Sequence, residues 1–541
     1  MGKPEPTGIK AWIFTTDHKK IAVLYLVTSL VFFVVGLLLA IIMRTKLLVP
    51  DREFLISNEL YNVFFTIHGA AMVLFWMIPV LLGFFANYLI PLMIGAHDVA
   101  FPRVNALSYW MYVGACLIAV LGLVLPGRLD IGWTGYPPYS VTGPANTALY
   151  VFAVHLLGAS SISGAVNFIT TIITLRAPGM TWGRLNLTVW GIFGSFIIQL
   201  IGVPVLAAAV TLLLFDKYLG THFYDTNGGN PLLYQHLFWF YAHPAVYVVA
   251  LPVFGIVSDI VSTFARKRIF GYTSMVIAMM IITVLGFEVW VHHLYVAGTL
   301  NWSRIVFMWG TILIGVPTGI KVFNWLATLH KGSIDLKTPM LYALGFIALF
   351  TIGGITGIAN GLVGFDIHVH DTHWVVAHFH YVLALSMSML VLGGIYYWFP
   401  KMTGKMYDEK LGQLGFWLTL VGALIAFFPH FMMGVDGIPR RYAILPAEYT
   451  GMIRISSLFS YIAIAGFFIT IWNYIKSARS GAPAPANPWN SLSLEWTIPS
   501  PPPFYNFEKI PVITSDPYEY GKPEGHGEEK GAVGGHAAHH H

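Results

Sequence analysis

Polar residues with metal-binding chemistry stand inside long apolar segments of this sequence. The stretch FWFYAHPAVYVVALP, residues 238–252, places His243 and Tyr247 four residues apart, so a helix presents both on one face. An unpaired polar group in hydrocarbon costs several kcal/mol, and a polar residue kept there is by default functional. Neutral imidazoles bind copper, zinc or haem iron, so metal chemistry is the first hypothesis.

Histidines recur at one depth in these apolar segments. Independent core histidines would scatter in depth, whereas six of them, from four segments, are expected in the outer half of the membrane. These six are His68, His243, His292, His293, His378 and His380. Their common depth favours a metal site. His155 has no partner at this spacing and is interpreted as a core histidine.

The spacing of these histidines predicts how they divide. His378 and His380 are two residues apart, about 200° around a helix, so they face opposite sides and suit two different cofactors. His292 and His293 point about 100° apart and, with His243, could converge on one ion. Three neutral imidazoles suit copper or zinc.

Membrane-spanning helices are expected to position these residues. The chain has 541 residues and is 56% hydrophobic and 10% charged, with a mean hydropathy of +0.68. Apolar runs of 18 or more residues indicate membrane-spanning helices. Twelve such runs are expected, at about 20–43, 61–90, 104–125, 146–175, 186–214, 232–262, 270–297, 303–328, 339–361, 371–398, 411–433 and 452–476. The fold class is therefore predicted to be an all-α polytopic membrane protein, a bundle of about twelve transmembrane helices.

The Lys and Arg residues predict the orientation of this bundle. They are more numerous in the loops on the N-terminal side, which places both termini in the cytoplasm. The net charge of +5 is thus a topology signal and gives no indication of nucleic-acid binding. We expect no cleaved signal peptide, because the segment before the first span is polar and lacks a small-residue cleavage site.

Three regions follow from this topology. Residues 1–19 are a cytoplasmic segment, 20–476 a twelve-helix domain, and 477–541 a Pro- and Gly-rich cytoplasmic tail with little core of its own. The terminal HAAHHH is interpreted as a tag or a low-complexity end. Cys116 is the single cysteine, which excludes an internal disulfide and a two-cysteine metal centre.

Several stretches, in order along the chain, resemble subunit I of the haem–copper terminal oxidases, in the bacterial A-type cytochrome c oxidase branch. They are TIHGAAM (66–72), NYLIPLMIGAHDVAFPRVNALS (87–108), YAHPAVY (241–247), VWVHHLYVAG (289–298), VPTGIKVFNWLATLH (316–330), HDTHWVVAHFHYV (370–382) and GIPRRY (437–442). The likeness runs from about residue 15 to 507. It implies a proton-pumping respiratory enzyme of the bacterial inner membrane that reduces O2 to water with electrons from cytochrome c.

The resemblance implies two haems, expected to be of the A type, and one copper ion, CuB, within the bundle. The implied ligands are His68 and His380 for the low-spin haem iron, His378 for the high-spin haem iron, and His243, His292 and His293 for CuB. Tyr247 corresponds to a tyrosine that is covalently joined to a CuB histidine and donates an electron and a proton during O–O cleavage. The division agrees with the two faces expected for His378 and His380.

Further implied sites lie in loops and at a span end. Arg440 and Arg441 would pair with haem propionates, which suits the bidentate reach of guanidinium groups. His370 and Asp371 would lie at a Mg²⁺ site shared with a partner subunit. Arg44 would contact a haem substituent.

Two proton paths are implied as well. Lys321 and Thr318 would belong to a K-type path, and a lone lysine in a span is costly unless it is hydrated or neutral. A D-type path would comprise Asp98, Asn87, Asn105, Asn167, Ser160 and Ser161. The alternative for each serine is that it only aids helix packing.

The sequence departs from the family pattern beside His243. Many relatives carry a glutamate two residues after this histidine, where this chain has Ala245. A variant class has a tyrosine–serine pair before the histidine, but here Tyr241 is followed by Ala242. We expect Tyr241 and Glu288, one helical turn before His292, to replace this relay. The alternative is that Glu288 faces another helix.

The electron donor and the partners follow from the same resemblance. Quinol-oxidising relatives carry a histidine and a glutamine where this chain has Leu60 and Val63, which favours cytochrome c. The receiving copper centre, CuA, requires a subunit II, and a subunit III is also expected. The alternatives are a quinol oxidase, a nitric-oxide reductase of the same superfamily, or a redox-free transporter whose histidines relay protons.

Overall fold

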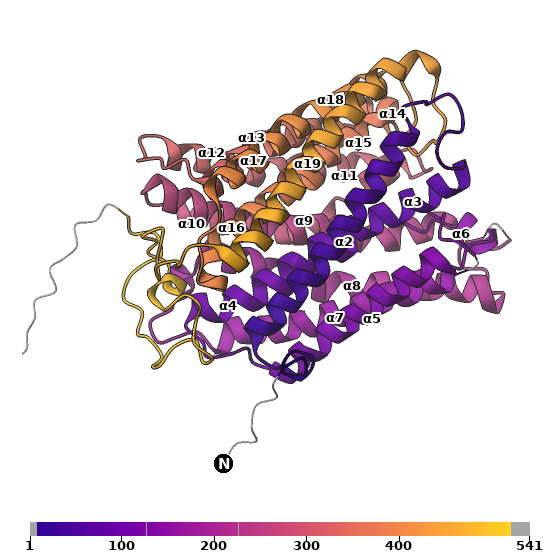
Figure 1. The fold of residues 1–541 in the computed structure, drawn as a ribbon. Helices are drawn as coiled ribbons and strands as arrows, with labels where there is room; N and C mark the ends of the chain where they lie inside the picture. The colour runs from indigo at the N-terminus through magenta and orange to yellow at the C-terminus, as the bar shows by residue number, and fades with distance from the viewer. Residues whose placement is uncertain (1–7, 126, 226, 521–541) are drawn as a thin grey trace, which may run out of the picture.

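The computed structural model describes residues 8–125, 127–225 and 227–520 as a bundle of long helices (Figure 1). Twelve helical segments are long and apolar enough to cross a membrane, which confirms the predicted fold class. They are His18–Lys46, Asn58–Ile94, Pro102–Val124, Thr147–Thr174, Leu187–Leu219, Pro231–Ala265, Tyr272–Leu294, Asn301–Leu329, Thr338–Gly361, His373–Thr403, Glu409–Val435 and Ala447–Ser480. The described residues form isolated β-bridges and no strand.

Several spans are built from more than one helical element. The α-helices are α1 (Lys10–Ile13), α2 (His18–Lys46), α3 (Asn58–Ala70), α4 (Ala86–Ile94), α5 (Pro102–Val124), α6 (Tyr139–Thr142), α7 (Thr147–Thr174), α8 (Leu187–Leu219), α9 (Pro231–Ala265), α10 (Tyr272–Leu285), α11 (Asn301–Leu313), α12 (Gly315–Leu329), α13 (Thr338–Gly361), α14 (Val363–Val369), α15 (His373–Phe379), α16 (Ser388–Thr403), α17 (Glu409–Ala426), α18 (Phe428–Val435) and α19 (Thr450–Ser480). Side-chain caps begin some of them. Asp17 accepts the Lys19 N–H at 2.9 Å, and Ser57 accepts the Leu60 N–H at 3.2 Å.

Tighter or wider turns interrupt three spans. The second and tenth contain π-helical segments, η1 (Ala71–Met77), η2 (Pro79–Phe85) and η6 (His380–Met387). The seventh ends in two 3₁₀ segments, η4 (Gly286–Glu288) and η5 (Trp290–Leu294). Such departures from α-helix often mark functional sites. Here they include His380, His292 and His293.

Helix α9 forms the centre of the bundle and is buried along almost its whole length. Two glycines let α8 approach it. A Cβ on Gly191 would lie 2.1 Å from the Leu251 carbonyl oxygen, and one on Gly255 would lie 2.3 Å from the Thr188 Cα. Small residues at such crossings are the usual means of close helix packing in membranes. This contact fixes the helix that carries His243.

The described C-terminal segment, residues 481–520, packs against the end of the bundle where α2 begins (Figure 1). The sequence predicts a tail with little core of its own. In the structure this segment buries Trp489, Trp496 and Tyr518 against the bundle. Lys19 donates to the Phe504 carbonyl at 2.8 Å, so both ends of the described chain lie on one side of the bundle. Residues 521–541, with the histidine-rich end, lie outside the described residues.

Candidate functional site

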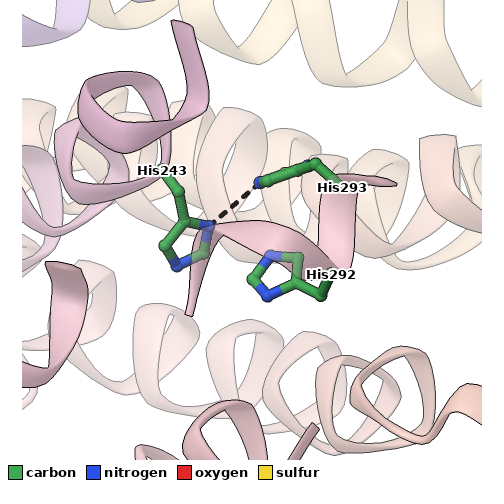
Figure 2. Close-up of side chains that lie close together, drawn as sticks. All are labelled: His243, His292 and His293. Carbon is green, nitrogen blue, oxygen red and sulfur yellow. Dashed lines mark hydrogen bonds between the residues drawn. The ribbon is translucent and has the colours of Figure 1, made fainter. Parts of the chain in front are cut away.

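Three histidines converge at one point in the bundle. His243 comes from α9, and His292 and His293 come from η5; their ligand atoms all lie within 4.8 Å of one another. His243 Nδ1 lies 3.0 Å from His293 Nε2 (Figure 2). Nitrogen ligands at about 2.0–2.1 Å from one ion come about 3 Å apart. The geometry therefore fits a single metal ion held by three imidazoles, as the spacing predicts.

Neighbouring side chains hold these rings. Thr311 of α11 donates its hydroxyl proton to the Phe307 carbonyl at 2.6 Å, so its oxygen accepts from His292 Nδ1 at 3.1 Å. This leaves His292 Nε2 unprotonated and able to bind a metal. The His293 ring stacks on Trp239 with centroids 3.5 Å apart and planes 9° apart. Sequence spacing gave no sign of Thr311.

Tyr247 lies one turn after His243 on α9, as predicted. Its hydroxyl oxygen is 3.0 Å from His243 Nε2. Since His243 Nδ1 faces His293 and Nε2 faces Tyr247, the metal side and the phenol side of this ring are separate. A phenol in this position can exchange a proton or an electron with the centre.

The three other histidines share a different arrangement. In each, Nδ1 faces a backbone carbonyl: His68 faces Gly36 at 2.9 Å, His378 faces Gly353 at 3.0 Å, and His380 faces Val376 at 2.8 Å. A carbonyl only accepts, so Nδ1 carries the proton and Nε2 keeps its lone pair. All three rings are therefore in the tautomer that ligates iron through Nε2.

His378 and His380 face different neighbours, in agreement with the prediction from their spacing. His378 also contacts Thr356 of α13 at 3.1 Å. The His380 ring instead stacks on Phe427, between α17 and α18, with centroids 3.9 Å apart. The contact with Thr356 is a further feature that sequence spacing does not indicate.

One cavity of about 500 Å³ joins these groups. Its lining includes all six histidines together with Arg44, Arg440 and Arg441. Most of the other lining residues are apolar, as expected of a pocket for a large flat cofactor with a charged edge. The donor set and the tautomers of the histidines fit two haems and one metal ion.

The two arginines differ in their pairing. Arg440 donates through Nε and NH2 to Asp371 Oδ1, at 2.9 and 2.6 Å. Arg441 lies 5.6 Å from the Phe65 ring centroid, and its buried Nε has no hydrogen-bond partner among the described residues. Burial, together with the charge of Arg440, lowers the pKa of Arg441 to about 10. A carboxylate of a cofactor would satisfy this donor.

His370 and Asp371 lie together near Arg440. His370 Nδ1 is 2.6 Å from Asp366 Oδ2, which leaves Nε2 facing the Asp371 carboxylate at 3.9 Å. Burial raises the pKa of Asp366. Asp366 is not among the residues that the resemblance implies, although its position four residues before His370 on one helix face is a usable signal.

The predicted K-type residues lie on α12. Lys321 is fully buried, with Nζ 3.1 Å from the Met275 carbonyl and 5.5 Å from the Phe254 ring centroid. Thr318, one turn away, donates to the Ile314 carbonyl at 2.9 Å. In the described part of the chain, no hydrogen bond joins the Lys321 and Thr318 side chains.

The predicted D-type residues gather where α4, α5 and α7 meet. Asn105 donates to Asn87 Oδ1 at 2.5 Å, and Asn167 Oδ1 accepts from the Phe101 N–H at 2.8 Å. Ser160 donates to the Ser108 carbonyl at 2.7 Å. The cavity lining described above also includes Asn87, Ser108, Ser160, Ser161 and Tyr25. Sequence analysis did not include Tyr25 and Ser108.

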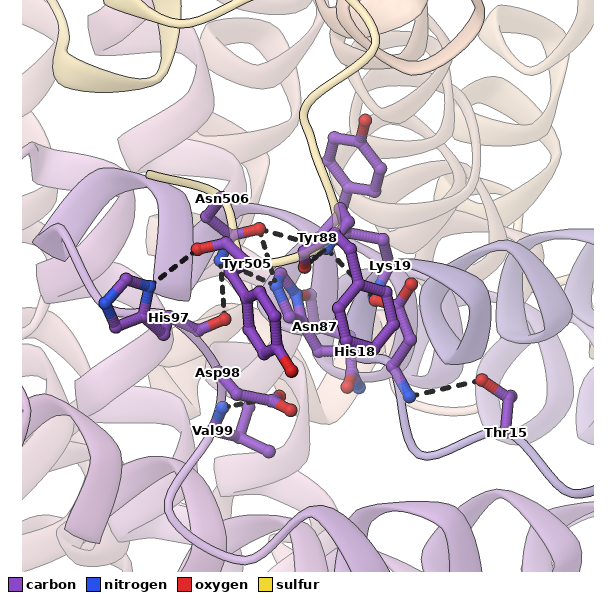
Figure 3. Close-up of polar contacts among 12 residues, drawn as sticks. Thr15, His18, Lys19, Asn87, Tyr88, His97, Asp98, Val99, Tyr505 and Asn506 are labelled. Atoms are coloured by element: carbon purple, nitrogen blue, oxygen red, sulfur yellow. Dashed lines mark hydrogen bonds and ion pairs between the residues drawn. The ribbon is translucent and has the colours of Figure 1, made fainter. Parts of the chain in front are cut away.

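Asp98 lies in the loop before α5, beside the C-terminal segment (Figure 3). Its carboxylate accepts the Val99 N–H at 2.7 Å. Burial raises its pKa to about 6. His97, the residue before it, faces the Tyr505 carbonyl at 2.8 Å. The C-terminal segment thus forms part of the rim around Asp98.

The structure does not place Glu288 at the cavity, where the relay hypothesis would need it. Glu288 ends η4 and is exposed on the side of the bundle, away from the cavity. Glu288 would share a face with His292 in a continuous α-helix, but α10 ends at Leu285. In 3₁₀ turns, residues four apart point about 120° apart instead of about 40°.

Tyr241 does lie at the cavity, as expected. Its hydroxyl donates to Gln199 Oε1 of α8 at 2.8 Å, and both side chains are buried. Gln199 Nε2 has no partner among the described residues. His155, interpreted as a core histidine, contacts the Val151 carbonyl at 2.8 Å and the Thr211 hydroxyl at 2.9 Å, which agrees with that interpretation.

Known proteins of one family are similar to this chain. It is 45% identical over 526 residues to "Cytochrome c oxidase subunit 1" of Thermostichus vulcanus, covering 95% of both chains. It is 45% identical to the subunit of that name from Cereibacter sphaeroides, covering 92% of this chain and 95% of that one. A "Probable cytochrome c oxidase subunit 1-beta" of Nocardia farcinica is also 45% identical, with 95% and 88% covered.

A solved structure and a family description agree with these relatives. The structure, titled "Cryo-EM structure of a heme-copper terminal oxidase dimer provides insights into its catalytic mechanism", shares the fold with a TM-score of 0.74 at 21% identity. The match covers 94% of this chain and 96% of the solved chain. The sequence model described as "Cytochrome C and Quinol oxidase polypeptide I" matches residues 20–469. The chain belongs to this family of oxidase subunits.

Proposed function

We propose that this chain is the catalytic subunit of a respiratory terminal oxidase, a cytochrome-c oxidase that reduces O2 to water and moves protons across the membrane. One observation carries the proposal. Three histidines face one point, and three more offer a free Nε2 to the same cavity. Family membership and the relatives' names support the same activity. Reducing O2 to water consumes four electrons and four protons, so the site needs both kinds of supply.

The residues of the cavity divide into three ligand sets. His68 and His380 would hold one haem iron, His378 would hold a second, and His243, His292 and His293 would hold copper. When bound, these groups would accept electrons and bind O2. Arg440 and Arg441 would hold the carboxylates of the haems, which we expect to be of the A type. The buried unpaired Nε of Arg441 supports its part in this proposal.

The chain's own groups would handle the protons. Tyr247, 3.0 Å from His243, would donate a proton and an electron at the site. Lys321 with Thr318 would form one route to it, and Asp98 with Asn87, Asn105, Asn167, Ser160 and Ser161 a second. Oδ1 of Asn105 and Nδ2 of Asn167 are buried without a hydrogen-bond partner among the described residues, which suits a hydrated path.

Tyr241 is the remaining candidate for the relay that Ala245 cannot provide. Its bond to Gln199 places two buried polar groups beside the cavity without a carboxylate. The pair can pass a proton only through the phenol and ordered water, because an amide side chain does not titrate. The absence of a carboxylate at position 245 is therefore compatible with Tyr241 acting alone.

We further propose the partners and the setting. The chain's single cysteine, Cys116, is buried in α5, so a CuA centre would belong to subunit II. A subunit III, cytochrome c and O2 complete the proposed partners, and His370 with Asp371 would hold Mg²⁺ at a subunit boundary. The twelve spans and the Lys and Arg bias suit a bacterial inner membrane protein with both ends in the cytoplasm.

The test uses the purified complex in sealed liposomes. Reduced cytochrome c and pulses of O2 are supplied while O2 consumption and external pH are followed. We expect O2 consumption with acidification outside. Turnover with quinol but not with cytochrome c would instead identify a quinol oxidase. Turnover only with nitric oxide would identify a reductase, and absence of haem bands and copper would favour a redox-free transporter.

Tyr241→Phe separates the relay from the rest of the proposal. We expect this variant to lose acidification or slow in turnover, with haem and copper content unchanged. Glu288→Gln is the matched control, because Glu288 is exposed and should leave both measurements at the wild-type level. Equal acidification in all three proteins would remove Tyr241 from the relay.

A further inference from the structure

A buried glutamine completes the surroundings of Tyr241. Gln199 of α8 and Tyr241 of α9 are 0% and 5% exposed, and the Tyr241 hydroxyl donates to Gln199 Oε1 at 2.8 Å. A Cβ on Gly202, three residues after Gln199, would lie 2.7 Å from Tyr241 Cδ2. The missing side chain at Gly202 therefore gives the Tyr241 ring its place against α8.

Gln199 lies on the face of α8 that borders the cavity. Phe196 and Val203, three residues before it and four residues after it, belong to the cavity lining, and positions so spaced share one helix face. Tyr241 and Ala245, one turn apart on α9, belong to the same lining. The Tyr241–Gln199 pair thus lies in the cavity wall within one helical turn of position 245, where the sequence has no carboxylate.

The Gln199 amide has a donor without an acceptor. Its Oε1 accepts from Tyr241, but its Nε2 is buried and has no hydrogen-bond partner among the described residues. An amide nitrogen carries two N–H groups, and buried polar groups are as a rule hydrogen-bonded to protein or to ordered water. The pair is therefore incomplete without an acceptor for this nitrogen, and in a path for protons that acceptor is water.

The direction of the Tyr241 hydrogen bond limits what Gln199 can do. In a transfer through Tyr241, an incoming proton bonds to the hydroxyl oxygen while the proton already there leaves, so the phenol is unchanged afterwards. The leaving proton points at Gln199 Oε1, and an amide oxygen accepts a hydrogen bond but is too weak a base to take the proton. The hydroxyl must therefore turn from Gln199 towards water in the cavity before its proton can leave.

We propose that Gln199 is a positioning residue of the proton relay: its Oε1 holds the Tyr241 hydroxyl between transfers, and its Nε2 binds the water that delivers the proton. The inference rests on the proposed function and deepens it, because it takes Tyr241 to be the relay. Gln199 does not titrate, so it acts only through Tyr241 and this water. The unit of water, glutamine and tyrosine takes the place of the carboxylate that position 245 lacks.

The test compares variants of the purified complex in liposomes. Gln199→Met removes both polar atoms with little change of shape, Tyr241→Phe removes the hydroxyl, and the double variant removes both groups. O2 consumption, external pH, and haem and copper content are measured. We expect Gln199→Met to keep its metals, to lose most of the acidification and to slow by up to about 10²-fold, the cost of misplacing a reacting group by about 1 Å.

Infrared spectra report the Tyr241 hydroxyl directly. The C–O band of this phenol is assigned by its loss in Tyr241→Phe. We expect the band to shift in Gln199→Met, because the phenol has lost its acceptor. Gln413→Met is the control, since Gln413 of α17 donates to Glu409 Oε1 at 3.1 Å and is not part of the cavity lining. It should leave the band and the acidification at the wild-type level.

Two further measurements test whether Gln199 acts through Tyr241. The double variant should be no slower than Tyr241→Phe alone, because the effects of residues that act as one unit do not add. Gln199→Glu keeps an acceptor oxygen for Tyr241 and adds a group that titrates. We expect it to turn over faster than Gln199→Met and to show a pH-dependent step in acidification that wild type lacks.

Three outcomes overturn the inference. In the first, Gln199→Met turns over and acidifies as wild type does. In the second, the losses in Gln199→Met and Tyr241→Phe multiply in the double variant, so that Gln199 does not act through Tyr241. In the third, which decides the matter if Gln199→Met does not assemble, Gln199→Glu keeps the wild-type pH dependence. Absence of O2 consumption by the wild-type complex would instead refute the proposed function, so the two failures are distinguishable.

Discussion

At the residue scale, the site depends on which ring nitrogen of each histidine is already engaged. Backbone carbonyls engage Nδ1 of His68, His378 and His380. A threonine engages Nδ1 of His292. These contacts select the tautomer before any metal binds, so binding does not have to reorient the rings.

Removing one such contact should weaken the metal site without altering a ligand. Thr311→Val deletes the acceptor for His292 Nδ1, and loss of an outer partner of this kind typically costs 10–100-fold in metal affinity or activity. In chelator titrations, we expect Thr311→Val to lose its copper at a correspondingly higher free copper concentration than wild type. Elemental analysis measures the copper that remains bound. Thr170→Val is the control, because within the described part of the chain the Thr170 hydroxyl donates only to the Val166 carbonyl of its own helix. Equal copper retention in both variants would contradict this role.

Tyr247→Phe should separate metal binding from turnover. The phenyl ring fits the same space, but the hydroxyl 3.0 Å from His243 is lost. Since a positioned proton donor contributes typically 10²–10⁴-fold, we expect O2 consumption to fall by about that factor. Copper and haem content should stay at wild-type levels. Wild-type turnover would show that the phenol has no part in the chemistry.

The sequence predicted the histidines and the tyrosine of this site better than the side chains that hold them in place. Depth and spacing brought out the six histidines and Tyr247, because each lies within a long apolar span. Thr311, Thr356 and Gln199 come from other helices, at separations that no periodicity encodes.

At the element scale, the seventh span shows why an apolar run does not fix a helix type. Hydropathy locates the span, and the structure confirms it. It does not reveal that α10 ends at Leu285 and that η4 and η5 follow with 3₁₀ geometry. This is why Glu288 does not lie on the face that spacing predicts. The same change of geometry brings His292 and His293 to face α9.

The contact between α8 and α9 should be intolerant of a single added methyl group. Gly191→Ala would place a Cβ 2.1 Å from the Leu251 carbonyl oxygen, so the helices must separate. Overpacking typically costs about 1–3 kcal/mol, and we expect a lower thermal unfolding midpoint with reduced haem content. Gly354→Ala is the control, since nothing lies within 4 Å of its Cβ position. An alanine there should be neutral or stabilising.

At the scale of the whole molecule, the ionised Asp98 carboxylate should lower the free energy of unfolding, although the proposed proton path uses this residue. Burial raises the pKa of Asp98 from 3.8 to about 6, so the folded protein binds the proton more tightly than the unfolded chain. Stability is therefore lost as pH rises from about 4 to about 6, and the loss is complete above that range. The penalty at neutral pH is at most about 3 kcal/mol, reduced by solvent screening at this half-buried site.

Asp98→Asn should remove this penalty. We expect the variant to unfold at a higher temperature than wild type at pH 8, with the difference shrinking towards pH 4. Proton uptake in liposomes should fall at the same time. A stability difference that is constant across this pH range would show that the Asp98 charge is not its cause.

The bonds between the two ends of the chain have a consequence for biosynthesis. His18, at the start of the first span, is buried and bonds Asn506 at 3.2 Å across a separation of 488 residues. At about 5–20 residues per second, roughly 25–100 s pass between the synthesis of these two partners. The first span therefore enters the membrane with a nitrogen that only the last part of the chain can satisfy. A chain truncated at residue 500 would keep all twelve spans but would lack Asn506, the partner of His18 at this end of the bundle.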